Sequence, residues 1–290
     1  MKGSILGFVV LEAGTTLLMK QLLNLAIHPY FVVLVSGLAA SALMAVAFWR
    51  QPSFKKELLN LKVIKSIWPT AVFITLGNLF GFAALKLTRA TNYILLARTS
   101  VLLSPILAWL ILREKVNHKI WPLVASVLLG IWLLTGDWRL IFNLSGDSLA
   151  ALTALTISLD FIWQKRAMIK VPLELMAFWR RLLSAILVGG IWLVTPQLGQ
   201  TSFHFTGLGG MALGFAGMSF FMARALKVQA VAEFNLLINL SPVLVGLSAY
   251  FLFGERLSGG QLVGAAFIIG SLVTFNLIKK QESLKLKAKR

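Results

Sequence analysis

Long apolar runs, separated by short polar joints, occupy most of this chain of 290 residues. A helix that crosses the hydrocarbon core of a bilayer needs about 20 such residues, so the sequence predicts ten membrane spans. The runs are continuously apolar, whereas the wall of a membrane barrel requires alternation. The predicted spans cover residues 3–24, 30–50, 67–87, 91–112, 119–136, 148–167, 173–194, 206–226, 229–253 and 260–278.

The composition agrees with a membrane protein. Hydrophobic residues make up 58% of the chain and charged residues 13%, whereas soluble domains carry about 25% charged residues. The mean hydropathy is +0.83. The first apolar run resembles a signal peptide, but Glu12 interrupts it and no small-residue cleavage motif follows, so we expect a retained first span. The absence of cysteine excludes disulfides and thiolate metal sites.

One stretch of the chain occurs twice. The segment at 84–114 recurs at 225–255, an offset of 141 residues, and Glu114 aligns with Glu255 without a gap. Such self-similarity indicates a duplicated unit. Each copy holds five spans, an odd number, so the second copy must enter the membrane from the opposite face. The predicted fold is an all-α integral membrane protein with ten transmembrane helices in two inverted five-helix repeats. We expect the repeats at 1–141 and 142–278, and a basic cytoplasmic tail at 279–290.

The basic residues predict the orientation. A net charge of +18 could indicate nucleic acid binding, but the charges lie in short joints between apolar runs. On the two sides of the predicted spans, Lys and Arg number 20 and 5, and the richer side is cytoplasmic. We therefore expect a multi-pass protein of the cytoplasmic (inner) membrane, with both termini in the cytoplasm and no nucleic acid partner. The longest polar joint, 51–66, is expected to lie on the membrane surface.

The last two spans carry a family resemblance. The segment LSPVLVGLSAYFLFGERLS at 240–258 is followed by GQLVGAAFIIGSLV at 260–273. With the ten spans and the duplication, these segments resemble the EamA-type transporters of the drug/metabolite transporter superfamily. The first copy, ending LREKV at 112–116, fits more loosely, because Pro105 lies one turn after the position that Pro242 predicts. The resemblance implies a small-molecule carrier, often an exporter of amino acids or related metabolites.

Five ionisable residues lie well inside predicted spans, where each costs about 2.5–3.5 kcal/mol on insertion scales. Asp160 and the neighbouring pair Arg180 and Arg181 lie at a similar depth in two helices of one hairpin, roughly 10–12 Å from its turn. We predict that Asp160 pairs with one arginine, and that the other could meet an anionic group of a substrate. Glu12 and Arg98 could pair across the central cavity. Without a cation beside it, burial would favour the protonated form of Glu12, which could then carry a proton.

Polar residues that differ between the two copies complete the predicted substrate site. At the offset of 141 residues, Arg98 aligns with Asn239, Asn78 with Ser219, and Ile94 with Asn235. Such residues could contact a substrate or only bond a neighbouring helix. Trp163, one turn from Asp160, could receive a cationic amine or anchor the helix at the membrane interface. The predicted substrate-binding residues are Glu12, Asn78, Arg98, Asp160, Trp163, Arg181, Ser219, Asn235 and Asn239.

These observations predict a secondary transporter that moves a small polar or amphipathic metabolite, such as an amino acid or amine, by alternating access, in the export direction. Spans one, three, four, six, eight and nine are expected to line its cavity. The chain has neither a G-x-x-x-x-G-K-[ST] phosphate loop nor an H-E-x-x-H metal spacing. We therefore expect no metal, no cofactor and no enzyme activity. A membrane-embedded enzyme or a channel is the alternative, and a proton is the candidate coupling ion.

Overall fold

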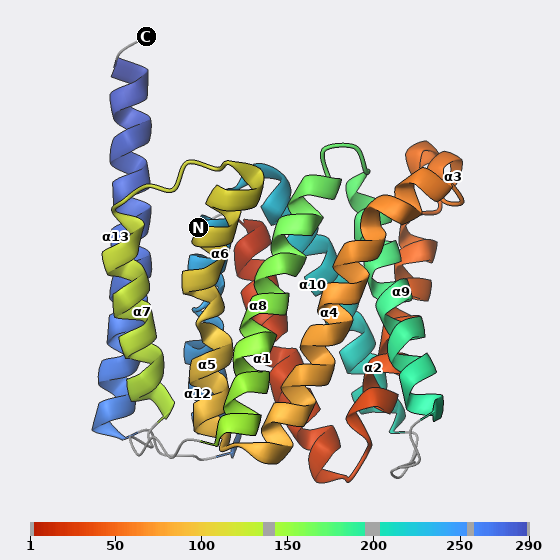
Figure 1. Ribbon diagram of the computed structural model, residues 1–290, viewed down its shortest axis with the longest axis horizontal. Helices are drawn as coiled ribbons and strands as arrows, with labels where there is room; N and C mark the ends of the chain where they lie inside the picture. Colours follow the sequence, from red (N-terminus) through yellow and green to blue (C-terminus); the bar gives the residue numbers. More distant parts are fainter. Residues whose placement is uncertain (1–2, 136–142, 195–203, 254–257, 289–290) are drawn as a thin grey trace.

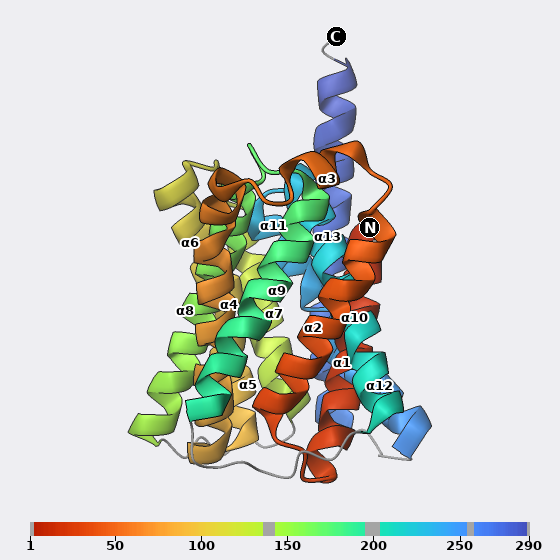
Figure 2. The ribbon, with the colours of Figure 1, turned by 90° about the vertical axis from the view of Figure 1, so that its right-hand side faces the viewer.

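The computed structural model describes residues 3–135, 143–194, 204–253 and 258–288. Its helices run side by side in one antiparallel bundle (Figures 1 and 2). The helices that form the spans are α1 (Gly3–Asn24), α2 (Pro29–Phe48), α4 (Leu61–Leu87), α5 (Ala90–Arg98) with α6 (Ser100–Leu112), α7 (Ile120–Thr135), α8 (Leu144–Ala167), α9 (Leu173–Val194), α10 (Phe205–Val228), α11 (Val231–Ile238) with α12 (Ser241–Phe253), and α13 (Gly259–Ala288).

The predicted all-α membrane fold is confirmed. Eight of the spans are long and apolar enough to cross a bilayer. The other two are α7, which is apolar and has 16 residues in the described part of the chain, and α8. Helix α8 has 24 residues but is less apolar, because it carries the four charged residues Asp147, Asp160, Lys165 and Arg166.

Two of the predicted spans are present, and each contains a break that was not predicted. The span predicted at 91–112 divides at Thr99 into α5 and α6, and the one predicted at 229–253 divides into α11 and α12. Pro242 accounts for the second break, because its ring has no N–H and clashes with the carbonyl four residues earlier. Pro105 lies too far along α6 to cause the first break. There, the Thr99 hydroxyl donates a hydrogen bond to the Leu96 carbonyl at 2.6 Å.

Two polar segments also differ from the prediction. The joint predicted at 51–66 is shorter, because it contains the small helix α3 (Pro52–Glu57) and α4 already begins at Leu61. The last helix was predicted to end at 278, yet α13 continues to Ala288 and projects beyond the other helices (Figure 1). Much of the basic tail is therefore a helical extension of the last span.

The helix contacts follow the pseudo-two-fold relation that the duplication predicts. Under the 141-residue offset, α1 corresponds to α8, α2 to α9, α4 to α10, and α7 to α13. Helix α4 packs on α8 as α10 packs on α1, and α4 packs on α9 as α10 packs on α2. The pairs α2–α9 and α7–α13 map onto themselves. Since α7 ends at the face where α8 begins (Figure 1), the second copy is inverted relative to the first.

The start of α2 shows how a joint outside the membrane is held. Pro29 occupies the first turn, and the Nδ1 atom of His28 accepts a hydrogen bond from the Tyr30 amide at 3.3 Å. Burial, and then the charge of Lys86, lower the pKa of His28. The imidazole therefore stays neutral at pH 7, and its Nδ1 atom keeps the lone pair that caps the helix.

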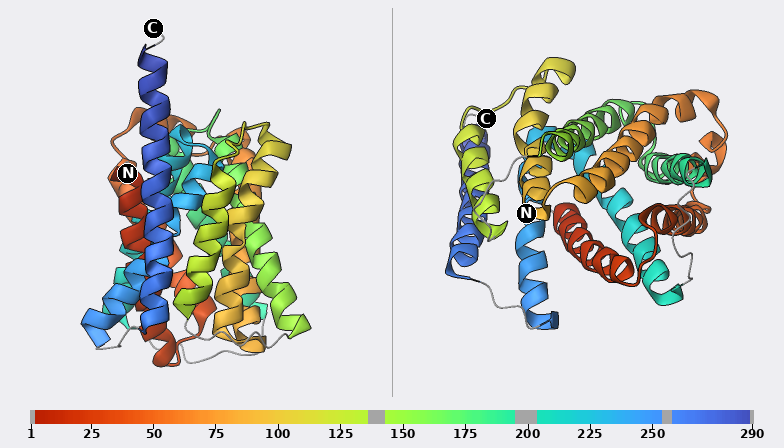
Figure 3. Two further views of the ribbon diagram at one scale, coloured as in Figure 1. Left: turned by 90° about the vertical axis from the view of Figure 1, so that its left-hand side faces the viewer. Right: turned by 60° about the horizontal axis from the view of Figure 1, so that its bottom comes forward.

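Two glycines allow α7 and α13 to touch at the edge of the bundle (Figure 3). A Cβ atom added at Gly264 would lie 2.5 Å from the Gly130 carbonyl oxygen, which is backbone and cannot turn away. Gly264→Ala should therefore lower the free energy of unfolding by about 1–3 kcal/mol. The matched variant Gly270→Ala, on the same helix, meets no atom within 4 Å and should raise stability slightly through helix propensity.

Thermal unfolding of the two purified variants in one detergent measures this difference. Equal melting temperatures for the Gly264 and Gly270 variants would contradict the close α7–α13 contact.

Candidate functional site

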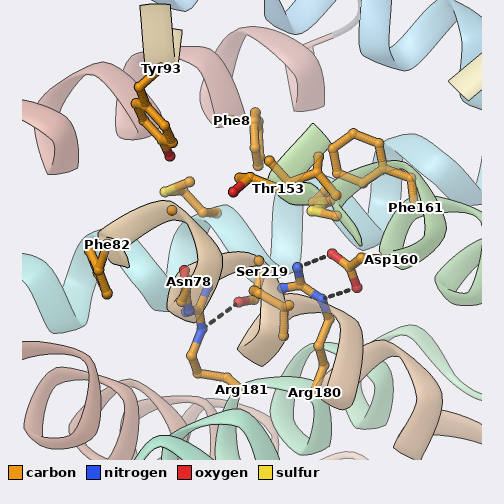
Figure 4. A pocket seen from close by; sticks show the side chains of 16 residues that line it. Phe8, Asn78, Phe82, Tyr93, Thr153, Asp160, Phe161, Arg180, Arg181 and Ser219 are labelled. Carbon is orange, nitrogen blue, oxygen red and sulfur yellow. Dashed lines mark hydrogen bonds and ion pairs between the residues drawn. The ribbon is translucent and has the colours of Figure 1, made fainter. Parts of the chain in front are cut away.

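A cavity of about 190 Å³ lies in the middle of the bundle, between the two five-helix copies (Figure 4). Its lining comes from α1, α4 and α5 of the first copy and from α8, α9 and α10 of the second. Five of the six spans that we predicted for the cavity wall contribute. The prediction was wrong for the ninth span, which consists of α11 and α12 and does not line the cavity. The seventh span, helix α9, lines it instead. Drug-sized ligands occupy roughly 300–1,000 Å³, so this cavity suits a smaller molecule.

An ion pair closes one side of the cavity, as predicted from the helical hairpin. Arg180 Nε donates a hydrogen bond to Asp160 Oδ1 at 3.1 Å, and Arg180 Nη2 donates to Oδ2 at 2.5 Å. Both residues are buried, with exposed fractions of 2% for Asp160 and 3% for Arg180. This two-pronged geometry is the strong form of an arginine–carboxylate contact. Both carboxylate oxygens of Asp160 are therefore occupied by one arginine.

Arg181 enters the same cavity without a carboxylate partner among the described residues. Its Nε atom donates a hydrogen bond to Ser219 Oγ at 3.3 Å, and its guanidinium carbon lies 4.3 Å from the centre of the Phe215 ring. The stem of Arg181 passes Gly37 of α2, where an added Cβ atom would lie 3.8 Å from Arg181 Cδ and would clash with Ala185 instead, at 2.8 Å. Asn78, from α4, lines the same cavity as Arg181 (Figure 4). Four predicted residues, Asn78, Asp160, Arg181 and Ser219, thus meet at this cavity.

The rest of the lining is mostly apolar and was missed by sequence reasoning. Phe8, Phe82 and Phe161 contribute aromatic surface, while Tyr93 and Thr153 add two hydroxyl groups (Figure 4). The Tyr93 hydroxyl points at Gly81, because a Cβ atom built on that glycine would lie 2.8 Å from it. An aromatic residue in an apolar run carries no sequence signal that separates cavity lining from lipid contact.

Four other predicted residues lie beside the cavity, at the two helix breaks. Arg98, the last residue of α5, has its Nη2 atom 3.3 Å from Glu12 Oε1. Within the described ranges, the second carboxylate oxygen, Glu12 Oε2, is buried without a hydrogen-bond partner. The predicted Glu12–Arg98 contact is therefore present, but it engages only one side of the carboxylate. Phe8 of the cavity lining lies one turn from Glu12 on α1.

Asn235 connects one break to the other, and Asn239 bonds within its own half-helix. Asn235 Nδ2 donates hydrogen bonds to the Ser100 carbonyl at 2.8 Å and to Ser104 Oγ at 2.7 Å. Asn239 Nδ2 donates to the Asn235 carbonyl at 2.6 Å. The bond to Ser100 satisfies a backbone oxygen where α6 begins, and bonding of a neighbouring helix is a common role of asparagine in membranes. Neither asparagine lines the cavity.

Trp163 lies away from the cavity. Its ring packs edge-on against Phe73 with a centroid distance of 5.6 Å, and the Arg166 guanidinium lies 5.9 Å from its centre. This placement matches an interface anchor near the end of α8. Among the described residues, no group of three His, Asp or Glu side chains could hold a metal ion.

A hydrogen-bonded network, here called the start network, joins the beginning of α8 to the turn between α4 and α5. Asp147 Oδ1 accepts hydrogen bonds from Thr88 Oγ1 at 2.6 Å and from Asn92 Nδ2 at 3.5 Å. Asn143 Nδ2 donates to the Leu87 carbonyl at 2.6 Å. Tyr93, which follows Asn92, lines the cavity. The start network therefore lies between the cavity and this face of the bundle.

A second network, the end network, joins the end of α8 to the turn between α10 and α11. Lys165 Nζ lies 2.6 Å from Glu114 Oε1 and also donates to the Gln229 carbonyl. Glu114 Oε2 accepts a hydrogen bond from the Val231 amide, in the first turn of α11, at 3.0 Å. Arg113, at a left-handed φ of 55°, ends α6 and turns Glu114 toward these partners. The start network holds the turn between α4 and α5, and the end network holds the turn between α10 and α11. These two turns correspond under the 141-residue offset.

Comparison with known proteins gives a family and a fold. The family model described as "EamA-like transporter family" matches the chain twice, over residues 2–136 and 144–277. No curated protein matches the sequence significantly. Among solved structures, 29 chains match. One, described as "Crystal structure of protein", superposes with a TM-score of 0.80 and covers 96% of both chains at 19% identity. At that identity the likeness shows the fold alone.

Proposed function

Because the chain belongs to the EamA-like transporter family, we propose that it is a secondary transporter that moves a small polar or amphipathic metabolite by alternating access. The observation that carries this proposal is the position of the cavity. It lies between two inverted copies and is lined by both of them. Secondary transporters with inverted repeats place their substrate site at such an interface, and one copy rocks against the other around it.

The start and end networks are the proposed gates. Helix α8 contributes to both, through Asp147 at one end and Lys165 at the other. Hydrogen bonds to charged groups contribute about 1.5–3 kcal/mol each, so either network is weak enough to open while the other stays closed. With both networks formed, both ends of α8 are held in place. Opening the start network alone would expose the cavity to one side, and opening the end network alone to the other.

The charge bias supports a proposed orientation. The arginine- and lysine-rich face carries the end network, so we place this face in the cytoplasm of the cell and the start network outside, in the cytoplasmic (inner) membrane. Both termini are then cytoplasmic. The repeats are proposed to meet near residues 141–142, with the tail at 279–290 leaving the membrane on the cytoplasmic side. Export is the proposed direction, on the strength of the family resemblance.

The predicted substrate residues divide into two proposed roles. Asn78, Arg181 and Ser219 are proposed to contact substrate, with Asp160 holding Arg180 at the cavity wall. Glu12 is proposed as the proton carrier in the state where its single contact with Arg98 opens. Two features favour movement there: Glu12 Oε2 is buried without a partner in the described structure, and Arg98 ends a half-helix.

Counterflow in reconstituted vesicles tests the transporter. A thermal-shift screen against amino acids, amines, carboxylates, purines and sugar phosphates first finds a ligand, because a ligand that binds only the folded state raises the melting temperature. Labelled ligand outside should then accumulate transiently in vesicles preloaded with unlabelled ligand, with a saturable rate. Flux that rises linearly with concentration and shows no counterflow would indicate a channel, and a chemically altered product would indicate an enzyme.

A further inference from the structure

The charged groups of the cavity do not balance. Its lining holds one carboxylate, Asp160, and two guanidinium groups, Arg180 and Arg181. Arg180 uses both oxygens of Asp160, so this pair is neutral and fully bonded. Arg181 is left as an unbalanced positive charge that is only 5% exposed. A buried charge without a counter-ion is costly, so a negative group belongs beside it.

The surroundings of Arg181 provide hydrogen-bonding groups but no counter-ion. Ser219 accepts its Nε–H, and the Phe215 ring covers one face. Among the described residues, no carboxylate lies within ion-pair distance of Arg181, and Glu12 is paired elsewhere, with Arg98. A guanidinium group carries five N–H donors in a fork that matches a carboxylate. The donors on the cavity side are therefore positioned for an anionic group that enters from outside.

The cavity lining itself leaves no carboxylate free for an ammonium group. Asp160 is the lining carboxylate, and both of its oxygens already accept bonds from Arg180. The remaining lining is apolar or aromatic, with Phe8, Ile157 and Met222 among its side chains. An amine or a zwitterion would bring its positive charge into a site that is already positive. An anion with an apolar body would neutralise Arg181 and cover these side chains.

We infer that the transported substrate is a small anion with one carboxylate-like group and an apolar body, without an ammonium group. This inference rests on the proposed transport function and narrows its substrate class. Arg181 binds the anionic group, Ser219 and Asn78 orient it, and the aromatic lining receives the apolar body. The cavity volume of about 190 Å³ limits that body to a short chain or a single ring.

Three probes that share one apolar body separate the charge classes. 3-Phenylpropanoate is an anion, phenylalanine a zwitterion and phenethylamine a cation, and butanoate, 2-aminobutanoate and propylamine form a shorter series. Calorimetric titration of the purified full chain at pH 7.5 should show that the acid of at least one series binds about tenfold or more tightly than its two partners. Tighter binding of the zwitterion or amine in both series would overturn the anion assignment while leaving the transporter intact.

Variants of Arg181 test whether this residue binds the anionic group of the acid. Arg181→Gln should weaken binding of the acid about 10- to 100-fold, because a charge-assisted hydrogen bond is lost, and Arg181→Lys should recover part of it. The control Lys62→Gln removes an exposed cation at the far end of α4 and should leave the affinity unchanged. Equal affinity of wild type and Arg181→Gln for the acid would overturn the proposal.

A measurement without ligand makes the test independent of the probes chosen. Asn78→Asp places a second carboxylate in the cavity lining that also holds Arg181 and should raise the melting temperature in HEPES–Tris buffer without added salt, while abolishing stabilisation by the acid. The matched variant Asn235→Asp should lower it, because Asn235 faces the Ser100 carbonyl and Ser104 Oγ. If Asn78→Asp lowered the melting temperature as much as Asn235→Asp does, the inference that Arg181 carries an unbalanced charge would be overturned. If the wild-type protein still showed counterflow, only the inference about the substrate class would be wrong, and the transport function would stand.

Discussion

Asp160→Asn is expected to lower the free energy of unfolding by about 3–5 kcal/mol, the cost of breaking a buried ion pair by removing one partner. The variant leaves Arg180 as a second unbalanced cation next to Arg181, in a cavity that already lacks a counter-ion. Reversible unfolding in detergent measures the loss. The same change at Asp147, at the less buried start of α8, should cost about 1 kcal/mol, because water can replace its bonds.

The double variant Asp160→Asn with Arg180→Gln separates a structural pair from a substrate contact. Both charges leave together, so most of the lost stability should return, with a coupling energy of roughly 0.5–3 kcal/mol between the two sites. Both Asp160 oxygens are occupied by Arg180, so Asp160 is not expected to contact the substrate. The stable double variant should therefore show counterflow. Counterflow that stays absent in the stable double variant would show that Asp160 itself contacts the substrate.

The main features of the fold could be predicted from the sequence because they are repeated in it. The offset that aligns Glu114 with Glu255 defines two copies, each copy holds five predicted spans, and inversion follows from that odd number. Likewise, Asp160 and Arg180 pair because a short turn brings equal depths of two helices together. Such predictions need only distances along the chain.

The sequence could not indicate how each helix is rotated about its axis. Arg180 and Arg181 are neighbours, yet one binds Asp160 and the other contacts Ser219. Successive residues differ by about 100° around a helix, and only packing decides which one faces the carboxylate. For the same reason, four predicted residues lie in the cavity, while Asn235 bonds a neighbouring half-helix.

The first helix break was hidden for a different reason. The run from Ala90 to Leu112 is apolar enough on average to count as one membrane span, and Pro105 lies within α6. Next to the break at Thr99, the Ser100 carbonyl accepts a hydrogen bond from Asn235, which lies 135 residues away in the sequence. Local propensity cannot report a partner at that separation, whereas Pro242 marks the second break directly.

Glu12→Gln is expected to abolish accumulation driven by a pH gradient and to leave substrate exchange intact. A gradient of one pH unit supplies about 1.4 kcal/mol per proton, a factor of about ten in concentration. Wild-type vesicles should approach that ratio for one coupled proton, with protein-free vesicles as the baseline for passive leakage. Glutamine keeps the size of Glu12 but cannot take up a proton. The substrate concentration ratio across Glu12→Gln vesicles should therefore stay near one.

The position of Glu12 explains why exchange should survive. Glu12 lies at the helix breaks, and the cavity itself is lined by Phe8, one turn away on α1. Counterflow moves substrate both ways without net proton movement, so it needs the cavity and the two networks but no titrating group. Since Arg98 loses its partner in this variant, Glu12→Gln with Arg98→Gln is the control for stability. Gradient-driven accumulation that persists in both variants would show that the proton, if one is coupled, binds elsewhere.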